Sequence, residues 1–136
     1  MPSPKPDPTR GASRRRFGAD VLASLHRGKT LEIRAGARPH RFIGIWVVVV
    51  EGRVFVRSWS LKPRSWWRTF QADPRGAIRV SGRPIAVRAV RTRSARLKRA
   101  VDRAYLAKYG TGGSRRYALD LARPTSQATT TELVPL

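Results

Sequence analysis

The strongest constraint on the fold of this chain is a pair of apolar segments joined by two turn residues. Residues 42–50 read FIGIWVVVV and residues 53–59 read RVFVRSW, with Glu51-Gly52 between them. β-Branched and aromatic residues favour strands, and a two-residue connection that ends in glycine is typical of a tight hairpin. We therefore expect a β-hairpin. Its first strand is nearly continuous in apolar residues, which is typical of a strand covered on both faces.

The two-residue turn also predicts the register of this hairpin. If Val50 lies opposite Arg53, alternation divides the side chains of the two strands between two faces. One face is aliphatic and is expected to be core; it contains Ile45, Val47, Val49, Val54 and Val56. The other face has Trp46 opposite Arg57, a pair that favours a cation–π contact, with Trp59 beyond it. We expect this second face to meet a ligand or another chain.

Shorter patterns predict the remaining elements. Helices are expected over 17–27, 66–72 and 95–109, and further strands over 31–35, 77–81, 84–92 and 116–122. Ser65 and Ser94 are the expected helix N-caps, and Gly82-Arg83 is the expected second hairpin turn. The tail to Leu136 is expected to add an extended edge. The predicted fold class is mainly β (α+β), a small six-stranded antiparallel barrel with flanking helices.

The N-terminal residues differ in composition from the rest of the chain. Residues 1–14 contain four prolines and no apolar periodicity, so we expect a disordered basic, proline-rich arm followed by a single domain over residues 15–136. They also lack the apolar stretch of a secretory signal. The longest apolar run is about half of what a membrane-spanning helix needs. We expect a cytoplasmic protein with no membrane segment.

Two residue counts narrow the chemistry. The chain has no cysteine, which excludes disulfides, thiol nucleophiles and thiolate metal sites. It has two histidines, His26 and His40, and its acids are scattered along the sequence. We therefore expect no metal site and no carboxylate pair of the kind that hydrolases use.

The net charge of +21, from 29 basic and 8 acidic residues, favours contact with polyanions. Most of the basic residues are arginines spread along the chain rather than gathered in one block. If nucleic acid is the partner, the expected footprint is Arg14–Arg16, Arg79, Arg88, Arg91, Arg93, Arg96 and Arg99. We consider a nucleic-acid role possible and do not favour it.

The segment from Ser58 to Arg75 carries the clearest chemical signal. Cations recur at Arg57, Lys62, Arg64, Arg68 and Arg75, against the single acid Asp73. Serine hydroxyls and the N-terminus of the expected helix add donors, and such surroundings suit a phosphate. Three tryptophans in the same segment supply flat surfaces for a ring system: Trp59, Trp66 and Trp67. Packing of Trp66 against Phe70 four residues later is an alternative use for one of them.

The sequence RSWWRTFQADP at residues 64–74 resembles the P-x-W-Y-x-N-L-x-A-N-P segment of deazaflavin-dependent nitroreductases. Those proteins share the flavin-type split-barrel fold with pyridoxamine-phosphate oxidase. The matched positions are Trp66, Trp67, Phe70, Ala72 and Pro74. Residues 36–39 resemble the Gly- and Arg-bearing loop of that fold, and the likeness extends over about residues 31–121. From WVVVVEGRVFVRS and TTTELVPL the chain is identified as a member of an uncharacterised bacterial family in that superfamily.

The resemblance implies a homodimeric split barrel that binds FMN or deazaflavin (factor 420) near the dimer interface. Hydride transfer of the nitroreductase type is the activity that it implies. The implied cofactor-binding residues are Arg38, Arg57, Ser58, Lys62, Arg64, Ser65, Trp66, Trp67 and Arg68. The catalytic residue stays unknown, because the cofactor itself carries the redox chemistry. The alternative function is a non-enzymatic module that binds nucleic acid or another polyanion through its basic surface.

Overall fold

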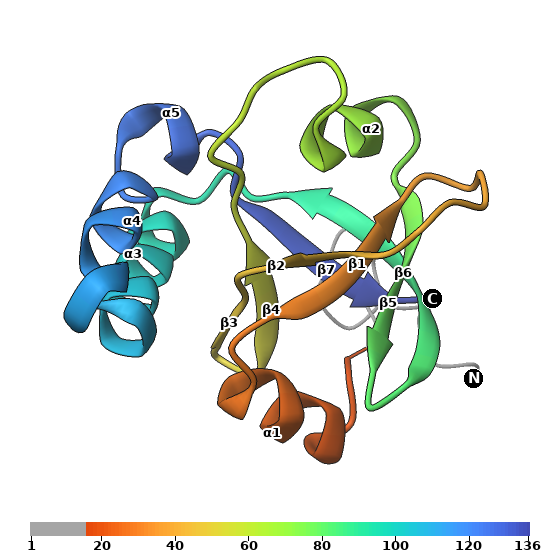
Figure 1. The fold of residues 1–136 in the computed structure, drawn as a ribbon, viewed down its shortest axis with the longest axis horizontal. Coiled ribbons are helices and arrows are strands. Elements are labelled where there is room, and N and C mark those ends of the chain that lie inside the picture. Colours follow the sequence, from red (N-terminus) through yellow and green to blue (C-terminus); the bar gives the residue numbers. More distant parts are fainter. Residues whose placement is uncertain (1–15) are drawn as a thin grey trace, which may run out of the picture.

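The computed structural model describes residues 16–136 as one antiparallel sheet flanked by helices (Figure 1). In chain order the elements are α1 (Ala19–Arg27), β1 (Leu31–Ala35), β2 (Ile43–Ile45), β3 (Val48–Val50), β4 (Arg53–Val56), α2 (Trp66–Ala72), β5 (Arg75–Val80), β6 (Arg83–Arg91), α3 (Ala95–Tyr109), η2 (Gly112–Ser114), α4 (Arg115–Asp120), α5 (Pro124–Gln127) and β7 (Thr131–Pro135). The α+β class is confirmed, with seven strands in place of the expected six. The predicted arm over residues 1–14 lies outside the described residues.

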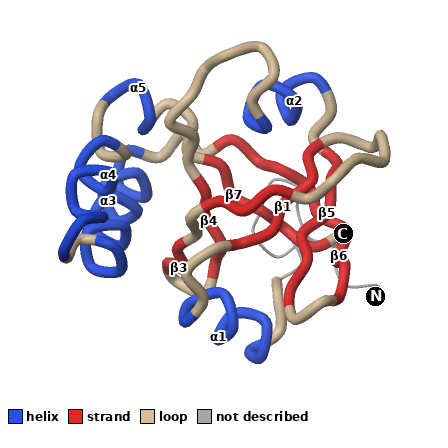
Figure 2. Tube along the Cα trace, in the orientation of Figure 1, coloured by secondary structure: helices blue, strands red, loops and turns tan. Residues whose placement is uncertain are grey.

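The seven strands follow the order β2-β1-β5-β6-β7-β4-β3, and every neighbouring pair is antiparallel. The strands at the two ends of this order, β2 and β3, are consecutive in the chain and are separated only by Trp46 and Val47. Two residues of extended chain span only about 7 Å. The two edges therefore lie close together, and the sheet curls into a barrel-like body (Figure 2).

The prediction of one continuous strand over residues 42–50 is wrong, because the strand is broken at Trp46 and Val47. The Val47 N–H donates to the Tyr109 hydroxyl at 3.2 Å, and the Val47 carbonyl accepts from Lys108 Nζ at 2.9 Å. Side chains of α3 thus satisfy the backbone N–H and carbonyl of Val47 where the strand is interrupted. The break lets the chain cross from one edge of the sheet to the other.

Both hairpin turns have a left-handed backbone at their two central residues. φ is +55° at Glu51 and +70° at Gly52 in the first turn, and +52° at Ser81 and +77° at Gly82 in the second. This is the geometry of type I′ turns, whose twist matches that of the flanking strands. The first hairpin has the predicted register, with β3 and β4 paired from Val50 opposite Arg53. The second turn lies one residue earlier than predicted.

The barrel interior is aliphatic, as the hairpin pattern predicts. Its buried residues are Phe17, Leu25, Leu31, Ile33, Ala35, Val47, Val54, Val56, Phe70, Ile78, Val87 and Leu133. Val47, Val54 and Val56 come from the face expected to be core, and all three are buried. Each of the buried Val, Leu, Ile and Phe side chains contributes roughly 1.5–3 kcal/mol by leaving water, so this cluster stabilises the barrel.

The opposite face of the hairpin is covered by helix, which corrects the expectation that it meets a ligand or another chain. A second buried cluster lies there, made of Val48, Phe55, Leu97, Val101, Tyr105, Tyr109, Ala118 and Leu121. The predicted contact between Trp46 and Arg57 is also wrong. Trp46 instead stacks on Tyr109, with ring centroids 3.9 Å apart. The apolar stripe of α3 needs a partner surface, and this face of the hairpin supplies it.

The C-terminal region differs most from the prediction. Residues expected to form a strand over 116–122 are largely helical, in α4, with Ala118 and Leu121 buried against α3. The last strand, β7, does not extend an edge but lies inside the sheet between β6 and β4. Its residues from Thr131 to Val134 are all buried. In the described part of the chain, no helix has the length and apolar character needed to cross a membrane.

Candidate functional site

The loop between β4 and α2 is held in one shape by its own serine hydroxyls. The backbone N–H of Ser58 donates to Thr129 Oγ1 at 2.8 Å, which anchors the start of the loop. Ser58 Oγ donates to the Ser60 carbonyl at 2.7 Å, and Ser60 Oγ accepts from the Lys62 N–H at 3.2 Å. Ser65 then caps α2 by accepting from the Arg68 N–H. The predicted ligands Ser58 and Ser65 therefore use their hydroxyls to shape the loop.

Two predicted cations on this loop remain available for a ligand. The side chains of Lys62 and Arg64 are exposed, and neither has a hydrogen-bond or ion-pair partner among residues 16–136. Arg68 is exposed as well, but its Nε donates to the Leu61 carbonyl at 3.0 Å. Its guanidinium also lies 4.9 Å from the centroid of the Trp67 ring. Lys62 and Arg64 are thus the free charges of the loop, and Arg68 is partly engaged.

The tryptophan that stays accessible is Trp59, not the pair that starts α2. Trp67 is only 8% exposed, and Trp66 is half-buried against the barrel core, edge-on to Phe70. Trp59 is 45% exposed. Its indole Nε1 donates to the Tyr117 carbonyl at 3.3 Å, and the two rings meet edge to face. Of the three tryptophans in the segment, Trp59 presents the most open ring surface.

Sequence reasoning missed a groove whose wall includes Tyr117, the residue that contacts Trp59. It has a volume of about 530 Å³ and is lined by Gly112, Gly113, Arg115, Arg116, Tyr117 and Leu119. Tyr117 is 44% exposed, and its hydroxyl accepts from Arg116 at 3.0 Å. This hydrogen bond raises the pKa of Arg116 above its ordinary value. The signal in the sequence is TGGSRRY, a glycine-rich run followed by two arginines and a tyrosine, whose last two residues fall in the strand expected over 116–122.

Arg57 is buried at the join between the two clusters and is not on an open face. It is 2% exposed, and four of its five N–H groups are engaged within the protein. Nε donates to Thr130 Oγ1 at 2.9 Å, and the terminal nitrogens donate to Asp102 and to the carbonyls of Lys98 and Leu121. Arg57 was expected to lie off the core; its burial corrects that expectation.

Arg38 lies near the other end of α2. The Ala37 N–H donates to Asp73 Oδ2 at 2.9 Å, which ties the β1–β2 loop to the residue that ends α2. Together with the Arg75 N–H, this bond holds the pKa of the Asp73 carboxyl below its usual range. Arg38 is exposed at the tip of that loop. Lys62 and Arg64 precede the N-terminal end of α2, whereas Arg38 lies near its C-terminal end. Because α2 has seven residues, its length of about 10 Å separates Arg38 from the two loop cations.

The sequence matches a family over most of its length. Residues 22–133 fit DUF2255, described as an uncharacterized protein conserved in bacteria. The chain belongs to this family. That confirms the expected membership of an uncharacterised bacterial family. No curated protein matches the chain significantly in sequence.

Two solved structures resemble the DUF2255 fold. A conserved hypothetical protein from Mycobacterium tuberculosis is 14% identical, with a TM-score of 0.54 over 92% of this chain and 82% of that one. An FAD-binding protein from Mesorhizobium loti is 16% identical, with a TM-score of 0.49 over 88% of this chain and 89% of that one. At such identities the first likeness shows a shared fold and nothing about ligands.

The accessible groups of the DUF2255 site fit one kind of ligand. Trp59 and Tyr117 offer apolar ring surfaces, and Lys62, Arg64 and Arg116 offer positive charge close to them in the chain. Aromatic surfaces bind flat rings, and exposed cations bind phosphate or carboxylate groups. No group of three His, Cys, Asp or Glu side chains in residues 16–136 is arranged to hold a metal ion. The arrangement is suited to an anionic molecule with a planar ring.

Proposed function

We propose that this DUF2255 protein binds FMN or a deazaflavin. The ring would lie against Trp59 and Tyr117, and the phosphate would meet Lys62 and Arg64. The observation that carries this proposal is the exposed Trp59 on a braced loop whose two cations have no partner in the described residues. A loop already held in shape loses little conformational freedom when a ligand binds.

The size of the groove supports this proposal. Pockets for cofactors and drug-sized ligands span roughly 300–1,000 Å³, and the groove beside Trp59 has about 530 Å³. Arg115 and Arg116 add positive charge along its wall. Gly112 and Gly113 carry no side chain into the groove, and nothing lies within 4 Å of the Cβ position at either residue. The backbone there is open to a flat ligand.

The chemistry of the proposed complex would come from the cofactor, which accepts and donates hydride. The protein would hold the ring, neutralise the phosphate and exclude water from one ring face. We propose an oxidoreductase of the nitroreductase type on this basis.

A homodimer fits the same surface, because Trp59, Leu61, Tyr117 and Leu119 are all large exposed apolar residues of this region. Light scattering on the purified protein measures that oligomeric state.

Variants of the two halves of the site test the binding proposal. Trp59→Leu removes the ring surface, and the double variant Lys62→Gln/Arg64→Gln removes two charges. The double variant is expected to weaken binding of FMN or deazaflavin by about tenfold or more, since a hydrogen bond to a charged group contributes roughly 1.5–3 kcal/mol. Trp59→Leu is expected to weaken binding by roughly two- to tenfold, since a ring–ring contact contributes about 0.5–1.5 kcal/mol beyond burial. Quenching of cofactor fluorescence during titration with apoprotein measures the affinity.

The matched control for the charge variant is Arg99→Gln/Arg103→Gln. It removes the same charge from exposed positions on α3, so it separates a local contact from a general electrostatic effect. We expect the control to bind the cofactor within about twofold of the unmodified protein at 0.15 M salt. Equal losses in both double variants would refute the assignment to the loop.

Polyanion binding is the second candidate function. It is favoured because most acids of the described chain are already paired, while several arginines of the expected footprint are exposed. Six acids of the described chain already pair with arginines: Glu32, Glu51, Asp73, Asp102, Asp120 and Glu132. Within the expected footprint, Arg79 and Arg96 are used in this way, and Arg14 and Arg15 lie outside the described residues. Arg88, Arg91, Arg93 and Arg99 are exposed. Duplex binding that does not weaken steeply with added salt would exclude phosphate-driven binding.

A further inference from the structure

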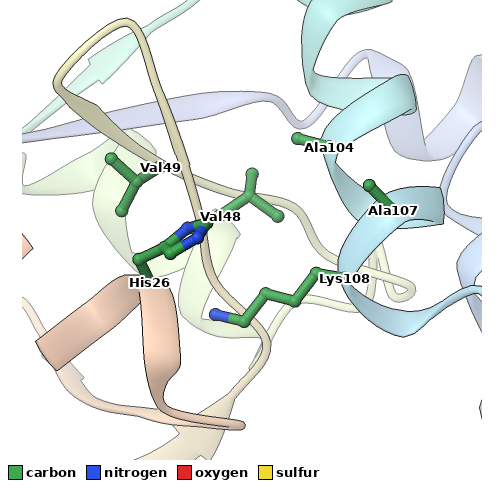
Figure 3. Close-up of a pocket in the computed structure, with 6 residues that line it drawn as sticks. All are labelled: His26, Val48, Val49, Ala104, Ala107 and Lys108. Atoms are coloured by element: carbon green, nitrogen blue, oxygen red, sulfur yellow. The ribbon is translucent and has the colours of Figure 1, made fainter. Parts of the chain in front are cut away.

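A second concave site lies at the other end of the barrel from the β4–α2 loop. It is a pocket of about 370 Å³ between the end of α1, strand β3 and helix α3 (Figure 3). Its lining residues are His26, Val48, Val49, Ala104, Ala107 and Lys108. In Figure 1, α1 lies below the barrel and the β4–α2 loop lies above it. The pocket is therefore separate from the proposed cofactor site.

Lys108 places its ammonium group at this pocket and holds it there. Nζ donates to the Leu25 carbonyl at 2.8 Å and to the Val47 carbonyl at 2.9 Å. An ammonium group has three N–H donors, so one remains after these two bonds. The charge is partly buried and has no acidic partner among residues 16–136. Burial lowers the pKa of Lys108 to about 8. A partly buried charge of this kind is stabilised when an anion comes to it.

His26 approaches the same space from α1. Figure 3 shows the His26 imidazole entering the space between α1, β3 and α3 from α1, and the Lys108 amine entering the same space from α3. The His26 side chain has no hydrogen-bond partner within the described residues. The rest of the lining is apolar and comes from β3 and α3. The pocket thus combines two nitrogen donors at one side with an apolar interior.

We propose that this pocket binds a small organic carboxylate. The carboxylate would accept hydrogen bonds from Lys108 Nζ and His26, and the apolar body would lie between β3 and α3. One lysine and one histidine suit a single negative charge better than a phosphate dianion, which needs more donors. At about 30 Å³ per water-sized group, the volume holds roughly a dozen non-hydrogen atoms. Benzoate, which has fewer non-hydrogen atoms than this, fits within the volume.

The test compares benzoate with benzyl alcohol, which has the same ring without the charge, by calorimetric titration of the full-length protein. We expect benzoate to bind at least about tenfold more tightly. Lys108→Met keeps the apolar stem, and it should weaken benzoate by about tenfold or more and abolish the preference over the alcohol. Lys98→Met on the same helix, ten residues and about 15 Å away, should leave both affinities unchanged.

A second variant covers the case in which Lys108→Met fails to fold. Ala107→Phe places bulk at the exposed rim of the pocket and leaves the hydrogen bonds of Lys108 intact. We expect it to lose benzoate binding while FMN or deazaflavin binding stays unchanged. Equal affinity for benzoate and benzyl alcohol would overturn the proposal. So would unchanged benzoate binding in Ala107→Phe, or no heat of binding at about 10 mM benzoate.

Discussion

The arginines around the β4–α2 loop differ in burial, and this difference separates those that stabilise the fold from those that a ligand can reach. From a buried position Arg57 links three separate parts of the chain: α3 through Lys98 and Asp102, Leu121 after α4, and Thr130 before β7. Removing one partner of a buried ion pair leaves the other charge and several polar atoms without partners, which is costly. At the surface, by contrast, a lone cation adds little to stability. Stability and the proposed ligand binding are therefore assigned to different arginines of the same segment.

The first prediction at this scale concerns Arg57→Met. It should lower the free energy of unfolding by about 3 kcal/mol, because Asp102 and Thr130 lose a buried donor. Arg64→Met, at an exposed position, should change it by less than about 0.5 kcal/mol. Urea denaturation followed by tryptophan fluorescence measures both. Similar midpoints for the two variants would show that the network around Arg57 is not stabilising.

The second prediction concerns Lys108 and pH. Its pKa is about 8 in the folded protein, below the ordinary value of 10.5. Between these values the unfolded chain holds the proton and the folded chain does not, so stability rises as pH increases from about 8. Denaturation at pH 8 and 9.5 should show this rise in the unmodified protein and in Lys98→Met. A rise of the same size in Lys108→Met would assign it to another group.

At the scale of elements, the sequence predicted those turns, caps and helices that are determined by residues close together in the chain. The type I′ hairpin, the Ser65 and Ser94 caps and the stripe of α3 all follow from nearby sequence. The break at Val47 did not, because its hydrogen bonds come from α3, about sixty residues later. The same holds for the candidate site. Its loop and cations were predicted, whereas the groove around Tyr117 and the burial of Arg57 depend on tertiary packing.

The prediction at this scale concerns β7. A C-terminal segment that only extended an edge could be removed at little cost, but β7 pairs with β4 on one side and β6 on the other. A chain that ends at Thr130 should therefore fail to fold, since it loses Leu133 from the core and two rows of hydrogen bonds. Removal of Leu136 alone, which is half-exposed, is the control. Cooperative unfolding of the shorter chain by circular dichroism would contradict the central position of β7.

On the scale of the whole molecule, the barrel separates two chemically different ends. The β4–α2 loop end combines open aromatic rings with cations that have no partner among residues 16–136, and the α1 end holds a lysine beside an apolar pocket. Most described acids are already paired with arginines, and most of the remaining described arginines are exposed to solvent. That excess attracts any anion at low ionic strength. Tests of function on this protein therefore need physiological salt and an uncharged comparison ligand.

The most direct test of the proposed function compares FMN with riboflavin, which has the same ring system without the phosphate. We predict that FMN binds the apoprotein at least about tenfold more tightly than riboflavin at 0.15 M salt, and that Lys62→Gln/Arg64→Gln removes this advantage. Quenching of flavin fluorescence measures both affinities. Equal affinity for the two flavins would contradict a phosphate site on the β4–α2 loop. Absence of quenching up to about 100 μM, with FMN and with deazaflavin, would contradict cofactor binding itself.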